Sequence, residues 1–151
     1  DNCKLMIRLY PHAWIEQQKE EVVRIKNIIN NVEISTSNLK DQIGWSDVAL
    51  FSSTSAGIES MLSGRYTINV ELHDLFKVDP IVGKGDLTKI TRCASPYDMK
   101  VEIQRIRNLD DNTFEREISN QIDFAKKIYG PINNDFIENF LFFNQWLNHY
   151  L

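Results

Sequence analysis

The chain has 151 residues, the usual size of one domain, and its 42% hydrophobic and 25% charged residues are typical of a globular protein. Its 17 basic and 21 acidic residues give a formal net charge of -4, which argues against binding of nucleic acid because such binders carry a basic surplus. No apolar run approaches the roughly 20 residues of a membrane-spanning helix. We therefore expect a cytoplasmic protein with no transmembrane segment, peripheral to the inner membrane at most.

Strand-like and helix-like segments alternate along the first 93 residues, which is the pattern of an α/β fold. The expected strands span residues 5–9, 32–34, 48–51, 66–70 and 90–93, and the helices between them span 14–29, 39–44 and 56–63. The continuous apolar run at 48–51 is typical of a central strand buried on both faces. Right-handed crossovers between such strands produce a mostly parallel sheet. The sequence therefore predicts a single Rossmann-like three-layer α/β/α domain over residues 1–151.

A helical extension is expected after the last strand. Ser95 and Pro96 are suitable cap and first-turn residues for one helix, and a second helix follows over 113–129. A terminal helix over 134–151 carries an aromatic stripe that includes Phe136. Core packing of this stripe is the simpler interpretation. Alternatively, its wide apolar face docks a domain missing upstream, or a second copy of the chain in a homodimer.

Hydroxyl residues follow the strand at 48–51 and open the next helix. They are Ser52, Ser53, Thr54 and Ser55. Unpaired amides at a helix start, together with the helix dipole, form an anion site to which hydroxyls add donors. Gly57 allows close approach of a backbone or a ligand, and Glu59 is placed to accept the hydroxyls of a ribose. In the alternative interpretation, Ser55 caps the helix and Glu59 only stabilises its first turn, at a spacing one residue longer than a capping box.

Residues 45–68 resemble the donor-binding motif in the carboxyl-terminal domain of GT-B-fold glycosyltransferases. The shared pattern is an apolar strand containing Asp47, a Ser/Thr cluster, a helix with a glutamate, and a small residue and Gly64 before the next strand. It is similar in particular to bacterial enzymes of surface carbohydrate, capsule and lipopolysaccharide synthesis, including sialyltransferase-like families. The helix start is also similar to that of polyol-phosphate transferases and nucleotide-sugar epimerases. The resemblance usefully covers residues 5–70 and implies a CMP- or UDP-linked sugar as substrate. We expect no cofactor and no metal.

The stretch after the first strand reads Arg8, Leu9, Tyr10, Pro11 and His12. In the families that the chain resembles, an Arg-x-His-Pro stretch at this point contacts the donor nucleotide. Here Tyr10 stands where the histidine would be, and His12 follows the proline. The resemblance implies donor contacts from Arg8, Tyr10 and Pro11, and it leaves open whether Tyr10, His12 or neither takes the contact of the family's histidine. His12 is the candidate catalytic residue, since an imidazole can donate to a phosphate oxygen or protonate the leaving group. The alternative is a surface loop with an incidental histidine.

Ser35 follows the second strand, where the loop of GT-B domains often lines the base pocket; a plain helix cap is the alternative. His12, His73 and His149 have no metal-ligand spacing, and no phosphate-loop motif is present. We expect a donor-binding half that stabilises charge on the departing nucleotide phosphate. The chain opens at Asp1 without an initiator methionine, so we expect a fragment whose acceptor-binding domain lies upstream. The rival interpretations are an epimerase or polyol-phosphate transferase half-domain, and a non-catalytic α/β partner-binding module.

Overall fold

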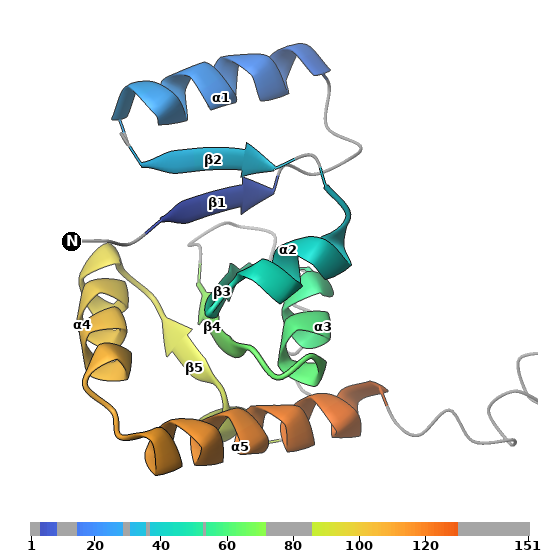
Figure 1. The fold of residues 1–151 in the computed structure, drawn as a ribbon, viewed down its shortest axis with the longest axis vertical. Helices are drawn as coiled ribbons and strands as arrows, with labels where there is room; N and C mark the ends of the chain where they lie inside the picture. The colour runs from blue at the N-terminus through green and yellow to red at the C-terminus, as the bar shows by residue number, and fades with distance from the viewer. Residues whose placement is uncertain are drawn as a thin grey trace, which may run out of the picture. The chain divides into compact units, whose positions relative to one another are not determined.

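A computed structural model describes residues 4–8, 15–28, 31–35, 37–52, 54–71 and 86–129. The chain divides into two compact units, the first ending at Trp45 and the second beginning at Ser46. Both units combine parallel strands with helices (Figure 1). The predicted α/β fold class with parallel strands is therefore confirmed.

The described part of the first unit consists, in chain order, of β1 (Leu5–Arg8), α1 (Ile15–Ile28), β2 (Val32–Ser35) and α2 (Leu39–Trp45). The two strands pair in parallel, with Leu5 opposite Val32 and Arg8 opposite Ser35. Helix α1 runs alongside this pair of strands (Figure 1). Because the pairing is parallel and in register to its end, the carboxyl ends of both strands lie at one edge, at Arg8 and Ser35.

The described part of the second unit consists of β3 (Val48–Phe51), α3 (Ala56–Leu62), β4 (Tyr66–Val70), the short 3-10 helix η1 (Leu87–Lys89), β5 (Thr91–Cys93), α4 (Pro96–Arg107) and α5 (Asp111–Tyr129). Its strands form a parallel sheet in the order β3-β4-β5. Helix α3 connects β3 to β4, as a parallel pair requires. The carboxyl ends of the three strands therefore meet at one edge of this sheet.

The prediction that residues 48–51 form a central strand buried on both faces is wrong. In its sheet, β3 lies at one edge, and the residue Leu50 is 42% exposed to solvent. The strand between two neighbours is β4, whose residues from Tyr66 to Asn69 are all buried. A continuous apolar run indicates a parallel strand, but it carries no information on how many neighbours the strand has.

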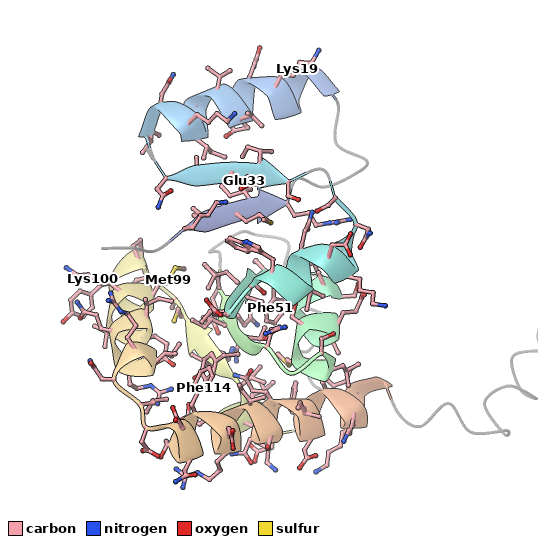
Figure 2. All side chains as sticks on the ribbon, in the orientation of Figure 1. Lys19, Glu33, Phe51, Met99, Lys100 and Phe114 are labelled. Carbon is pink, nitrogen blue, oxygen red and sulfur yellow. The ribbon has the colours of Figure 1, made fainter. Side chains whose placement is uncertain are left out.

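Two hydrophobic clusters form the core of the second unit. The first contains Phe51, Ile58, Met61, Ile90, Phe124 and Ala125, and the second contains Tyr66, Ile68 and Cys93. Side chains alternate along β4, so Tyr66 and Ile68 face the second cluster while Thr67 and Asn69 face the other way. Met99 of α4 and Phe114 of α5 pack against the second cluster (Figure 2). Helix α5 contributes to both clusters and so stabilises both faces of the sheet.

The start of α4 confirms the predicted cap chemistry. The Ser95 hydroxyl accepts a hydrogen bond from the Asp98 amide at 3.1 Å, and Pro96 occupies the first turn. The predicted terminal helix over 134–151, with its docking or dimer role, lies outside the described residues. Among the helices of the described ranges, none is both long and apolar enough to cross a membrane.

Candidate functional site

Ligands of open parallel sheets bind beyond the carboxyl ends of the strands, so the residues that follow each strand are the first to consider. In the first unit, Arg8 and Ser35 are the last residues of β1 and β2. In the second unit, Ser52, Thr54 and Ser55 follow β3. The remaining predicted contacts of this kind lie outside the described residues; they are Tyr10, Pro11, His12 and Ser53.

A polar network joins the carboxyl ends of β1 and β2. The Arg8 guanidinium donates through Nη1 to the Ser37 carbonyl and to Oε1 of Gln42, both at 3.2 Å. The Gln42 amide donates in turn to the Ser35 hydroxyl and to the Ser37 carbonyl, both at 2.8 Å. The structure thus brings two predicted site residues, Arg8 and Ser35, together through Gln42. We call these four residues the Arg8 network.

Helix α2 holds Gln42 in place. Asn38 caps this helix, since its side-chain oxygen accepts from the Asp41 amide at 2.9 Å and its side-chain amide donates to the Asp41 carboxylate at 2.7 Å. The cap is therefore Asn38 and not Ser35, whose hydroxyl instead lies 2.8 Å from that of Ser37. Gln42 is only 8% exposed. A buried glutamine with both ends hydrogen-bonded has little freedom, so it fixes the guanidinium of Arg8.

Arg8 differs from Arg24, Arg92 and Arg105 in the partners it has. Arg24 and Arg92 each pair with a glutamate, Glu21 and Glu71 respectively, and Arg105 pairs with two. Within the described part of the chain, Arg8 is exposed and bonds only to neutral acceptors. A guanidinium fixed in this way keeps its full positive charge available to an anion, which it can bind through two parallel hydrogen bonds.

In the hydroxyl segment after β3, Thr54 accepts hydrogen bonds from two backbone amides of the helix start that follows. The Thr54 hydroxyl accepts from the Ala56 amide at 3.3 Å, and the Thr54 carbonyl accepts from the Gly57 amide at 3.4 Å. Two of the amides proposed to hold an anion at the start of α3 therefore have a partner in Thr54. Ser55 makes no side-chain capping hydrogen bond, so the capping-box alternative is not what organises this helix start.

Gly57 lies against the ring of Phe51, and its predicted contact with a ligand stays a prediction. A Cβ atom at this position would overlap the ring of Phe51, and both residues are buried. The absence of a side chain therefore lets α3 pack directly on β3. Phe51 precedes the hydroxyl segment, so this contact fixes where the segment begins.

Glu59 points away from the packing face of α3. At about 100° per residue, Glu59 lies opposite the centre of the buried face formed by Gly57, Ile58 and Met61. Ser55 lies on the same outer side, and both residues are exposed. The predicted ribose contact of Glu59 stays a prediction; its carboxylate is open to solvent and is not turned toward the sheet.

A second polar cluster lies at the opposite end of β4 from the carboxyl edge. The Tyr66 hydroxyl contacts the side chains of Thr91, Glu102, Glu117 and Arg105 at 2.7 to 3.0 Å. Burial raises the pKa of Tyr66, and hydrogen bonds from Arg105 lower the pKa of both glutamates. At neutral pH the cluster is thus a protonated tyrosine and two ionised carboxylates around one guanidinium. Since Tyr66 is the first residue of β4, we interpret the cluster as a link between the sheet, α4 and α5.

Two surface hollows in the described part of the chain are lined by residues other than the predicted ones. One of about 330 Å³ is lined by Gln104, Arg107 and Asn108 at the end of α4, and one of about 530 Å³ lies along the outer side of α1. Across the described ranges, no group of three or more histidine, cysteine, aspartate or glutamate residues is arranged to hold a metal ion.

Comparison with known proteins finds no matching family model, no matching curated protein and no matching solved structure. The resemblance to GT-B-fold glycosyltransferases therefore stays a prediction that rests on the residues quoted above. The sequence identified Arg8 and Ser35 but missed Gln42. No local pattern in the sequence identifies Gln42, because its role follows from hydrogen bonds to residues of β1 and β2.

Proposed function

We propose that the chain binds a nucleotide-sugar donor, as the donor-binding half of a glycosyltransferase of bacterial surface polysaccharide synthesis. The observation that supports it best is the Arg8 network at the carboxyl edge of β1 and β2. A fixed and exposed guanidinium beside the Ser35 and Ser37 hydroxyls suits a phosphate ester. Its place at the carboxyl ends of parallel strands is where α/β sheets bind nucleotides.

The chemistry proposed for this site is stabilisation of charge. When the glycosidic bond to the nucleotide breaks, negative charge builds up on the phosphate oxygens of the leaving group. A guanidinium already in position stabilises that charge without first having to reorganise. No covalent intermediate on the protein is needed. Since the acceptor would bind in a second domain, we expect the chain alone to bind nucleotides with little or no turnover.

Replacing Arg8 with glutamine is expected to weaken binding of CMP or UDP about tenfold, because a charge-assisted hydrogen bond to phosphate is lost. Arg24→Gln is the matched control, since Arg24 is exposed on α1 and its recorded partner is Glu21, three residues away. Isothermal titration calorimetry at low salt measures both variants and the wild type. Equal dissociation constants for the two variants would show that Arg8 does not bind the nucleotide. If the wild type binds neither CMP nor UDP, the proposed function is wrong.

A non-catalytic partner-binding module is the second candidate, and one observation favours it. Thr54 already bonds the Ala56 and Gly57 amides, and the Phe51 ring fills the space beside Gly57. Two amides of the helix start that the sequence assigned to a phosphate therefore already have hydrogen-bond partners within the chain. The same titration separates the candidates, because a module of this kind binds neither CMP nor UDP.

A further inference from the structure

The direction of each hydrogen bond in the Arg8 network follows from what its groups can donate and accept. A guanidinium only donates, so the Gln42 atom that faces Arg8 is the amide oxygen Oε1. The other end of the amide, Nε2, then donates to the Ser35 hydroxyl and to the Ser37 carbonyl, both at 2.8 Å. Because Gln42 is buried and hydrogen-bonded at both ends, it determines which of the remaining groups donate and which accept.

The Ser35 hydroxyl has only one group left to which it can donate. Its oxygen accepts from Nε2 of Gln42 at 2.8 Å and from the Ser37 amide at 3.3 Å. A hydroxyl oxygen has two lone pairs, and these two donors use both of them. The Ser35 proton is therefore donated to the Ser37 hydroxyl oxygen, which lies 2.8 Å away. This leaves Ser35, which is partly buried, with no donor for a ligand.

The Ser37 hydroxyl is the last group in this series of hydrogen bonds. It accepts from Ser35, so its own proton is available to donate, and Ser37 is exposed. The carbonyl of the same residue already accepts from both Arg8 and Gln42. Ser37 thus offers a hydroxyl donor to a ligand, while its backbone oxygen is already used within the chain.

Arg8 likewise keeps donors that the network does not use. Nη1 has two hydrogens, which are donated to the Ser37 carbonyl and to Oε1 of Gln42, both at 3.2 Å. Within the part of the chain that the structure describes, no partner is recorded for the N–H groups of Nε and Nη2. These atoms form the edge of a guanidinium that binds two oxygens of one anion through parallel hydrogen bonds. The two exposed side chains of the network, Arg8 and Ser37, therefore both have hydrogens left to donate.

We propose that Ser37, and not Ser35, is the serine that donates a hydrogen bond to the ligand, together with Nε and Nη2 of Arg8. This inference rests on the proposed function and names the ligand group that the network binds. Unused donors favour an ionised phosphate, whose oxygens only accept, over the hydroxyls of a ribose or sugar, which also have a proton to donate. Ser35, which the sequence assigned to the donor site, then does not contact the ligand.

Calorimetric titration of the full chain at low salt compares serine variants for binding of CMP and UDP. Ser37→Ala should weaken binding about tenfold, because one hydrogen bond to a charged phosphate is lost. The loss should be equal for CMP and 2′-deoxy-CMP, since the ribose is not involved. Ser37→Thr keeps the hydroxyl and should bind like the wild type. Ser35→Ala should have a smaller effect than Ser37→Ala.

Ser119→Ala is the matched control, because Ser119 is an exposed serine on α5, and it should leave the affinity unchanged. A larger loss in Ser35→Ala than in Ser37→Ala would overturn the inference, and so would a loss in Ser37→Ala that disappears with 2′-deoxy-CMP. If Arg8→Gln weakens binding and Ser37→Ala does not, the inference fails while the proposed function stands. If the wild type binds neither CMP nor UDP, both fail together.

A second variant covers the case in which Ser37→Ala does not fold, as judged by circular dichroism. Ser37→Cys has nearly the same shape, but a thiol is only a weak donor, so this variant should also bind the nucleotide more weakly than the wild type. Wild-type affinity in Ser37→Cys would then overturn the proposal.

Discussion

Replacing Gln121 with leucine is expected to lower the free energy of unfolding by about 2–5 kcal/mol, the cost of two unpaired buried polar groups. Gln121 is 2% exposed on α5, and its side-chain amide bonds both polar groups of the Thr67 backbone. The Thr67 amide donates to Oε1 at 2.8 Å, and Nε2 donates to the Thr67 carbonyl at 3.0 Å. The recorded pairing of β5 with β4 begins only at Ile68, so Gln121 replaces a strand neighbour at Thr67. Leucine can replace the volume but neither hydrogen bond.

Gln104→Leu provides the matched control for this effect, because Gln104 is exposed on α4. Surface substitutions of this kind change stability by about 0.5 kcal/mol or less. Urea unfolding followed by circular dichroism measures both variants. Gln121→Glu should also destabilise the fold, since it keeps an acceptor for the Thr67 amide but removes the donor and adds a buried charge. Equal midpoints for Gln121→Leu and Gln104→Leu would show that the Thr67 backbone does not depend on this side chain.

Arg105→Met is expected to cost about 2 kcal/mol at neutral pH, less than for a fully buried ion pair because Arg105 is 39% exposed. Arg105 donates to Glu102 and Glu117 at 2.6 to 2.9 Å and to the Tyr66 hydroxyl at 2.7 Å. Without it, two ionised glutamates face each other around a buried tyrosine. Lys100→Met is the control, since it removes one positive charge from the same helix at an exposed position that points away from the sheet (Figure 2).

The cost of Arg105→Met should depend on pH in a definite direction. Arg105 lowers the pKa of Glu102 and Glu117 below their usual value of 4.5 in the folded protein. Groups whose pKa is lowered on folding stabilise the fold above that value and lose this effect as pH falls through the folded pKa. The difference in unfolding free energy between wild type and Arg105→Met should therefore shrink between about pH 7 and about pH 3. A difference that stays constant over this range would rule out the ionic role of the cluster.

Much of the fold could be predicted from the sequence because local signals agreed. The strand at Tyr66–Val70 and the start of α4 at Pro96 were predicted where they occur. The edge position of β3 could not be predicted, because strand order depends on contacts between distant segments. The role of Gln121 could not be predicted for a related reason. A glutamine on a helix is expected at the surface, and its hydrogen bonds to the Thr67 amide and carbonyl are known only from the structure.

In the candidate site, too, some residues could be predicted from the sequence and others could not. Arg8 and Ser35 could be identified because the carboxyl ends of strands follow from the alternation of strands and helices. Gln42 could not, since its role depends on hydrogen bonds that cross from α2 to β1 and β2. The hydroxyl of Thr54 was predicted to serve a ligand, yet it accepts from an amide only two residues away. Composition alone does not tell whether a serine or threonine bonds to a ligand or to its own backbone.

Nucleotide binding at the Arg8 network is tested most directly by an NMR titration of the isotope-labelled chain with CMP and then with UDP. The side-chain signals of Arg8 and Gln42 and the amides of Ser35 and Ser37 report on this network. Saturable shifts of these signals by at least one nucleotide are expected, and in Arg8→Gln the shifts of Gln42, Ser35 and Ser37 should need about tenfold more nucleotide. If neither nucleotide moves them at millimolar concentration, or if the shifts are confined to other parts of the chain, the proposed function is contradicted.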